Sequence, residues 1–185
     1  MKSRIRENIY SSVIKSPKIV RKIFADFVYS RAHNEYEMVE TPKIINLFIT
    51  DRCNLYCSHC FYSAHLNKPV HEMTLEQYEK VFSSMKHPFK TVIITGGEPF
   101  LRTDIVEIVK ILDKYKTEKI NMPTNATMPS VVVKKVKEIL DNANIDFNIQ
   151  VSIDGPEDLH DEIRGMKGSY KKCVETIKLL KDLKK

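Results

Sequence analysis

The chain has 185 residues, 42% of them hydrophobic, which is typical of one globular domain with or without a short extension. Its formal net charge of +6 comes from residues spread along the chain, so it is compatible with anionic partners but does not indicate nucleic-acid binding. No apolar run approaches the ~20 residues of a transmembrane helix, and residues 1–20 have no apolar signal-peptide core. We therefore expect a cytoplasmic protein, in which closely spaced cysteines bind metals or react more often than they form disulfides.

The first expected element is an amphipathic helix over residues 17–32. Its apolar face is formed by Ile19, Val20, Ile23, Phe24, Phe27 and Val28. Such a helix packs against a domain more often than it lies on a membrane surface. Residues 33–42 are polar and end at Pro42, so we divide the chain into a helical extension with a linker (1–42) and a core (43–185).

From residue 43 onward, strand-like segments alternate with helical ones. The expected strands are 43–50, 91–95, 119–122, which ends at Pro123, and 146–153. The expected helices are 73–86, opened by a capping box of Thr74 and Gln77, followed by 104–115, 130–141 and 169–183. This alternation predicts an α/β fold with parallel strands. The loops after the four strands should therefore open onto one face, where chemistry collects in such folds.

Three cysteines follow the first expected strand within eight residues: Cys53, Cys57 and Cys60. A loop this tight can wrap several thiolates around a small inorganic core. Three protein ligands, rather than the four of an electron-transfer cluster, leave one iron open, and an open coordination position is typical of a catalytic metal site.

Other interpretations of these cysteines remain open at this point. Zinc could use the three thiolates with His59, His65 or His71, although these spacings do not form two clean ligand pairs. A disulfide is disfavoured by the expected compartment and by the odd number of cysteines in the loop. The fourth cysteine, Cys173, falls on the apolar face of a helix and is interpreted as a small buried residue.

The Cys-x3-Cys-x2-Cys spacing directly after a buried strand resembles the signature of the radical SAM superfamily. The resemblance implies a [4Fe–4S] cluster held by Cys53, Cys57 and Cys60, with the amine and carboxylate of S-adenosylmethionine (SAM) on the fourth iron. It also implies a reductant such as flavodoxin or ferredoxin, reductive cleavage of SAM to a 5′-deoxyadenosyl radical, and hydrogen abstraction from a substrate. The cofactors carry this chemistry, and the protein orients and shields them.

The segment Gly96-Gly97-Glu98-Pro99 follows the second expected strand. Glycines allow a close approach of the backbone to a ligand. A Gly-Gly-Glu-Pro segment at this place is similar to the one that contacts the amino group of SAM in the family. Glu98 is assigned a binding or structural role rather than that of a general base.

Weaker resemblances follow the third and fourth strands. Asn125 lies in Thr-Asn-Ala where relatives often carry Thr-Asn-Gly, and it could otherwise be an ordinary turn residue. The segment from Ser152 and Asp154 to Arg164 resembles the peptide-modifying and sulfatase-maturating (SPASM-type) branch, which implies that Ser152 and Arg164 contact the ribose or carboxylate of SAM. The alternative for Arg164 is a surface ion pair with Asp161 or Glu162. His59 stands where the family often has an aromatic residue near the adenine, unless it is simply exposed.

The resemblance implies a partial (β/α) barrel of the radical SAM type. The family core usually has six βα units, and this sequence has four, so we expect either a chain truncated at its C-terminus or a site completed by another chain. Three functions follow: a radical SAM enzyme acting on a peptide or protein side chain, a non-catalytic cluster-binding fragment or subunit, and a zinc-binding interaction module.

Overall fold

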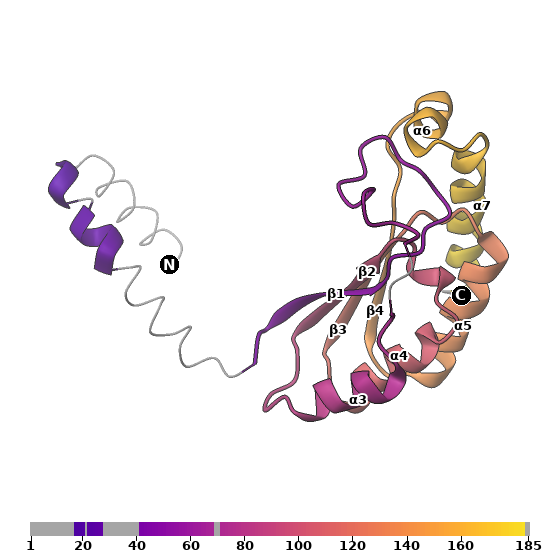
Figure 1. The fold of residues 1–185 in the computed structure, drawn as a ribbon. Helices are drawn as coiled ribbons and strands as arrows, with labels where there is room; N and C mark the ends of the chain where they lie inside the picture. The colour runs from indigo at the N-terminus through magenta and orange to yellow at the C-terminus, as the bar shows by residue number, and fades with distance from the viewer. Residues whose placement is uncertain (1–16, 21, 28–40, 69–70, 184–185) are drawn as a thin grey trace. The chain divides into compact units, whose positions relative to one another are not determined.

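The computed structural model describes residues 17–20, 22–27, 41–68 and 71–183, in two compact units, Met1–Glu40 and Thr41–Lys185 (Figure 1). In the first unit, residues 18–20 and 22–27 are helical, and the side chains of Ile19, Ile23 and Phe27 are exposed. The helix expected over 17–32 is confirmed for these residues, while Arg21, residues 28–32 and most of the expected linker lie outside the described residues. No described helix is long and apolar enough to cross a membrane.

The second unit is built on a parallel sheet whose strands lie side by side in chain order (Figure 1). The strands are β1 (Ile44–Thr50), β2 (Thr91–Gly96), β3 (Lys119–Thr124) and β4 (Asp146–Val151). Pairing is parallel throughout, with Ile44 opposite Thr91, Thr91 opposite Lys119, and Lys119 opposite Asp146. The predicted α/β class and the four parallel strands are therefore confirmed.

Two strand ends differ from the sequence prediction. Strand β3 continues through Pro123 to Thr124, although we expected it to end at the proline. Its pairing with β2 stops at Asn121, while its pairing with β4 continues to Thr124. Pro123 therefore lies beyond the shared ladder on the β2 side, where a missing N–H breaks no strand pairing. Strand β4 ends at Val151, two residues earlier than expected.

The helices that follow the strands include the four expected ones. They are α3 (Leu75–Ser83), α4 (Ile105–Lys114), α5 (Pro129–Asn142) and α7 (Ser169–Asp182). The predicted capping box opens α3. The backbone N–H of Gln77 donates to Thr74 Oγ1 at 3.3 Å, and the backbone N–H of Thr74 donates to Gln77 Oε1 at 2.9 Å.

Two helical segments were not predicted from the sequence. One is the short 3-10 turn η1 (Pro99–Leu101), and the other is α6 (Glu157–Arg164). Most of the eight residues of α6 are polar or charged, and His160 is its buried residue. A helix this short has little stability of its own and depends on tertiary contacts, so periodicity alone does not reveal it.

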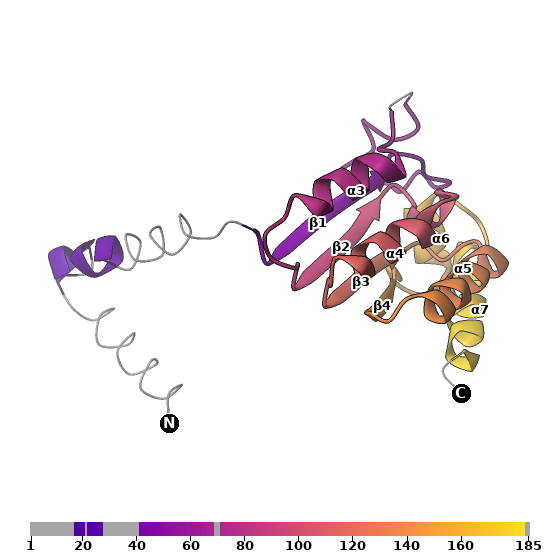
Figure 2. The same ribbon diagram turned by 90° about the horizontal axis from the view of Figure 1, so that it is seen from below.

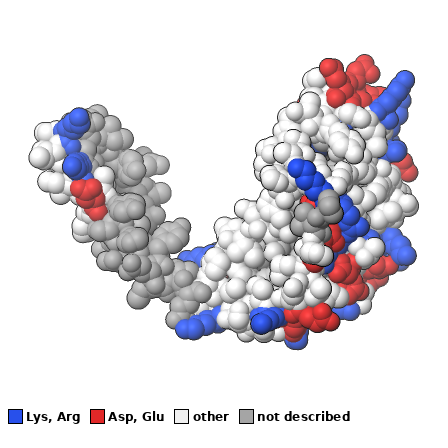
Figure 3. All heavy atoms as spheres, viewed as in Figure 1, with Lys and Arg blue, Asp and Glu red and all other residues white. Residues whose placement is uncertain are grey.

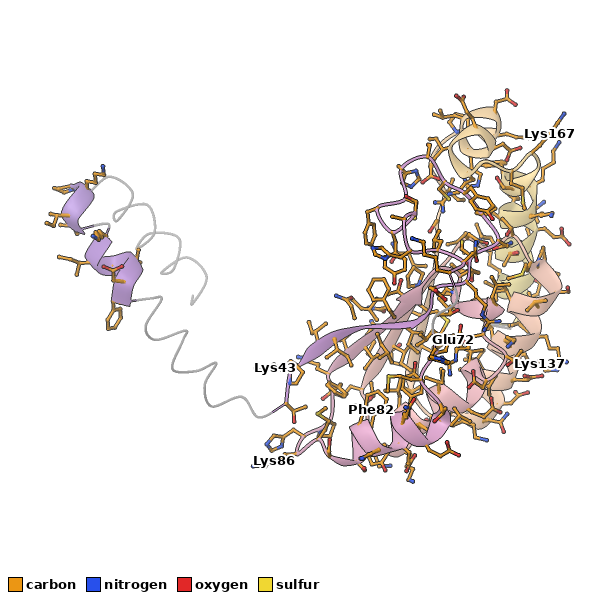
Figure 4. The ribbon with its side chains drawn as sticks, viewed as in Figure 1. Lys43, Glu72, Phe82, Lys86, Lys137 and Lys167 are labelled. Carbon is orange, nitrogen blue, oxygen red and sulfur yellow. The ribbon has the colours of Figure 1, made fainter. Side chains whose placement is uncertain are left out.

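The core lies between the sheet and α3, α4 and α5, which cover one face of the sheet (Figure 2). Val92, Ile94, Ile120 and Met122 point into this core and are fully buried. Phe82 of α3, labelled below the sheet in Figure 4, packs edge-on against Phe89, with ring centroids 5.7 Å apart. On the opposite face of β1, Ile44 and Phe48 are 59% and 45% exposed. The helices thus cover one face of the sheet, and the C-terminal ends of the strands carry the loops described next.

Candidate cofactor-binding site

A pocket of about 270 Å³ opens at the C-terminal ends of the strands. It is lined by residues from all four of the loops that we expected on one face. The first and second loops contribute Cys53, Cys57, His59, Cys60, Gly96, Gly97 and Glu98. The third and fourth contribute Thr124, Asn125 and Ser152, and Arg164 joins them from the end of α6. Two candidates lie outside this lining: Pro99, which is buried at the start of η1, and Asp154.

The Gly96-Gly97 turn holds the beginning of the cysteine loop, residues 51–72, against β2. The Gly97 N–H donates to Thr50 O, and the Glu98 N–H donates to Arg52 O, each at 2.8 Å. A Cβ on Gly96 would stand 2.1 Å from Thr50 O, and one on Gly97 would stand 2.2 Å from Arg52 O. Both glycines are therefore required by the backbone where β1 passes into the cysteine loop, a role that the sequence prediction of a close ligand approach did not include.

The far side of the cysteine loop is fastened by two further side chains that the sequence did not indicate. Asn67 Nδ2 donates to Cys53 O, and the Cys53 N–H donates to Asn67 Oδ1, both at 2.9 Å. Glu72, labelled in Figure 4, accepts a hydrogen bond from Thr50 Oγ1. Its two carboxylate oxygens also accept hydrogen bonds from Nε and Nη2 of Arg52, which forms an ion pair. The ends of the loop are thus tied to each other by contacts within the protein.

Glu98 lines the pocket and is almost fully buried, with 1% of its surface exposed. Its carboxylate accepts hydrogen bonds from Thr124 Oγ1 and the Asn125 N–H, both at 2.8 Å, and from the Phe100 N–H at 3.2 Å. Burial raises the pKa of Glu98, and these donors oppose that shift. The carboxylate thereby links the turn after β2 to the turn after β3, which fits the structural part of its expected role.

Asn125 continues this connection toward the cysteine loop. Its Nδ2 donates to Asn54 Oδ1, and Asn54 Nδ2 donates to Thr127 Oγ1, each at 2.9 Å. Ala126, where the family resemblance led us to expect glycine, adopts a left-handed φ of +53° and is fully buried. The turn therefore has a backbone conformation that glycine would favour, although the residue there is alanine.

The three thiols of the loop are free and half-buried around the same pocket. Burial raises the pKa of Cys53, and it also raises the pKa of Cys57, where the nearby Arg164 opposes the shift. Within the described part of the chain, no group of three or more His, Cys, Asp or Glu side chains is arranged to hold one metal ion. Thiolates that share a single zinc ion must all converge to about 2.3 Å from it. Three thiols of one loop around one pocket fit a cluster, in which each thiolate binds a different iron.

The histidines of the zinc interpretation are distributed differently. His59 lines the pocket, with 56% of its side chain exposed and Nε2 at 4.0 Å from Asp154 Oδ1. His65 and His71 do not line the pocket, and the ring of His65 lies 5.1 Å from that of Tyr62. The donor set at the pocket is therefore dominated by thiols.

Cys173 is fully buried in α7, as expected, and does not line the pocket. Its thiol donates to Asn125 O at 2.9 Å, and burial raises its pKa to about 11. A buried thiol held in the neutral form is a poor metal ligand, because metals bind the thiolate.

Arg164 forms a different ion pair from the one considered from the sequence. Its guanidinium pairs with Asp154 at 2.5 and 3.0 Å, rather than with Asp161 or Glu162. Asp161 instead accepts hydrogen bonds from Gly168, Ser169 and Tyr170 at the start of α7. Both Asp154 and Arg164 are thereby brought beside the cysteine loop.

In Figure 3, charged side chains are sparse at the left of the second unit, while basic and acidic side chains lie together near its centre. Lysine, arginine and acidic residues are instead mixed along the helices below and to the right. The net positive charge is therefore not gathered on this face.

The second unit resembles known proteins over most of its length. Residues 47–185 match the family model described as the Radical SAM superfamily. The chain is 32% identical over 151 residues to the antilisterial bacteriocin subtilosin biosynthesis protein AlbA of Bacillus subtilis, covering 80% of this chain and 32% of that protein. It is 30% identical over 149 residues to an AdoMet-dependent heme synthase of Methanosarcina barkeri, covering 78% of this chain and 40% of that protein.

Among solved structures, the chain is similar to Streptococcus suis SuiB bound to its precursor peptide SuiA. The TM-score is 0.61 at 20% identity, over 89% of this chain and 34% of SuiB, which shows a shared fold. The chain thus spans about a third of the length of the relatives that it matches.

Proposed function

The chain belongs to the radical SAM superfamily, and on that premise we propose that Cys53, Cys57 and Cys60 hold a [4Fe–4S] cluster beside a SAM site in the same pocket. The observation that carries the proposal is the meeting of these three thiols with the Gly96-Gly97 turn and with Asn125 around a single pocket. Soft thiolate donors are the usual ligands of iron–sulfur clusters. Cys173 is fully buried and is therefore not one of the proposed cluster ligands.

When bound, the reduced cluster supplies the electron that cleaves SAM to methionine and a 5′-deoxyadenosyl radical, which abstracts a hydrogen atom from the substrate. The chain's own residues bind and orient. Gly96 and Gly97, which line the pocket at the end of β2, would bind the amine of SAM, and Ser152, which lines it after β4, would bind the ribose or carboxylate. Buried Glu98 holds the turns after β2 and β3 together through its hydrogen bonds to Thr124 and Asn125. His59 and Asn125 complete the wall on which SAM would rest.

The proposed substrate is a peptide or protein side chain, and the proposed reductant is a flavodoxin or ferredoxin. The substrate class is supported by the names of two relatives: AlbA serves bacteriocin biosynthesis, and SuiB was solved with a precursor peptide. The second candidate function is a cluster-binding fragment or subunit without catalysis of its own.

Anaerobic reconstitution with iron and sulfide tests the cluster. We expect a brown protein with close to four irons per chain, and a loss of bound iron and colour in Cys57→Ala. The matched control is Cys173→Ala, which removes a buried thiol outside the pocket and should retain the cluster. One equivalent of zinc bound without cluster formation would contradict the proposal and favour the zinc-binding module.

Formation of 5′-deoxyadenosine separates the enzyme from the non-catalytic fragment. The reconstituted and reduced chain should convert SAM to 5′-deoxyadenosine and methionine, as measured by chromatography. A protein that binds the cluster and SAM but forms no 5′-deoxyadenosine would favour the fragment or subunit.

A further inference from the structure

The C-terminal end of α6, the helix that the sequence did not predict, packs directly on the cysteine loop. The Ser58 N–H donates to Ile163 O at 2.9 Å, across more than a hundred residues of chain. Gly165, with a left-handed φ of +65°, comes so close that a Cβ there would stand 3.0 Å from Tyr56 O. The residues on both sides of Cys57 therefore touch the last turn of α6.

Arg164 lies between these two backbone contacts, and each of its three guanidinium nitrogens faces a protein partner. Nε and Nη2 donate to the two carboxylate oxygens of Asp154, at 2.5 and 3.0 Å. The remaining nitrogen, Nη1, donates to Cys57 Sγ at 3.8 Å. The side chain of Arg164 is 11% exposed, so this geometry is not that of a mobile surface residue.

The backbone of Asp154 is held in place by the side chain of His160. The Asp154 N–H donates to Nδ1 of His160 at 3.3 Å, and His160 is fully buried. Because Nδ1 accepts this bond, the neutral ring carries its proton on Nε2, which faces Cys173 Sγ at 3.8 Å. A continuous set of contacts therefore runs from α7 through His160, Asp154 and Arg164 to Cys57.

We propose that Arg164 is a positioning residue for Cys57 and sets the electrostatic environment of the cluster bound through that sulfur. This inference rests on the proposed function. Reduction adds negative charge to a cluster, and a cationic hydrogen-bond donor at a ligating sulfur stabilises the reduced form. Asp154 orients the guanidinium and offsets part of its charge, but the guanidinium itself donates the hydrogen bond to the sulfur. Arg164 thereby raises the reduction potential of the cluster.

This role differs from the contact with the ribose or carboxylate of SAM that the family resemblance implies. A guanidinium binds a carboxylate best through two parallel hydrogen bonds. In Arg164 the side-on pair, Nε and Nη2, is taken by Asp154, and Nη1 of the other face donates to Cys57 Sγ. The two roles separate experimentally, because a SAM contact has no effect before SAM is added.

The test is a redox titration of the reconstituted, SAM-free cluster, followed by electron paramagnetic resonance. We expect Arg164→Gln to shift the midpoint potential to a more negative value, and Arg164→Lys, which keeps a cation, to lie between Gln and wild type. The matched control is Lys167→Gln, which removes an exposed cation three residues away and should match wild type. Lys167 is labelled at the end of the α6 region in Figure 4.

An unchanged potential in Arg164→Gln, together with weakened SAM binding, would overturn the proposal and return Arg164 to a SAM contact. If Arg164→Gln does not retain a cluster, Asp154→Asn carries the test. It removes the offsetting negative charge and should shift the potential to a more positive value, and no shift there would equally overturn the proposal. Failure of wild type to form any cluster is a separate result, which contradicts the proposed function itself.

Discussion

The side-chain amide of Asn67 is paired in both directions with the backbone of Cys53, donating to its carbonyl and accepting from its N–H at 2.9 Å. The backbone N–H of Asn67 also donates to Asp51 O at 3.0 Å, and Asn67 adopts a left-handed φ of +56°. Asparagine tolerates that conformation better than most residues. One side chain thereby closes the cysteine loop around its first thiol.

Removal of this amide should loosen Cys53. Asn67→Gly keeps a residue that accepts the left-handed backbone but loses both hydrogen bonds, each of which contributes about 1 kcal/mol. Asn67→Ala should be less stable than the Gly variant, because its Cβ also strains the turn. Urea unfolding measures both effects, and iron content after reconstitution should fall in the same order. A Gly variant with wild-type stability and iron content would show that the pairing has no positioning role.

Substitution of Gly97 should disrupt the site more severely than substitution of an unobstructed glycine. In Gly97→Ala the new Cβ would meet the carbonyl oxygen of Arg52, and backbone atoms cannot move aside as a flexible side chain can. We expect a loss of about 3 kcal/mol or more in the free energy of unfolding. The control is Gly168→Ala, where nothing lies within 4 Å of the added Cβ and backbone strain alone should cost about 1–2 kcal/mol. Equal losses in the two variants, measured by urea unfolding, would refute the steric explanation.

Glu98→Gln tests the buried connection between the turns after β2 and β3. The Asn125 N–H donates to one carboxylate oxygen, and an NH₂ group at that position would leave this donor without an acceptor. An unsatisfied buried donor costs about 1–3 kcal/mol. Chemical denaturation should show this loss for Glu98→Gln and almost none for the exposed control Glu118→Gln. A loss below 0.5 kcal/mol, about the effect of an ordinary surface substitution, would contradict the prediction.

Asp161 should make the stability of the α6–α7 junction dependent on pH. Hydrogen bonds from Tyr170 N–H, Gly168 N–H and Ser169 Oγ lower the pKa of Asp161 to about 2, from 3.8 for the unperturbed group. Because the folded pKa is the lower one, the stabilisation is present above pH 3.8 and is lost as the pH falls through about 2.

The corresponding variant is Asp161→Asn, with Asp158→Asn on the exposed side of α6 as the matched control. Thermal unfolding between pH 2 and 6 should show a destabilisation by Asp161→Asn that is largest at pH 6 and shrinks toward pH 2. A difference from wild type that stays constant over this range would mean that the carboxylate charge plays no part.

The alternation of strands and helices, the parallel sheet and the position of the thiol loop followed from the sequence, because each depends on local patterns. Runs of β-branched residues mark buried strands, and the C-terminal ends of parallel strands meet at one edge of their sheet. From these two facts alone, the loops carrying Cys53, Gly97, Asn125 and Ser152 were expected to open together, and in the structure they line one pocket.

The tertiary structure decided which groups hold that pocket in shape. Gly96 and Gly97 allow the backbones of Thr50 and Arg52 to approach closely. Arg164 pairs with Asp154 rather than with Asp161 or Glu162, which are nearer in the sequence. These contacts depend on which segments, distant in the sequence, lie close together in the fold, and a local sequence pattern does not contain that information. Helix α6 is too short and too polar to be stable without the cysteine loop and α7 beside it, so its existence was likewise settled by packing.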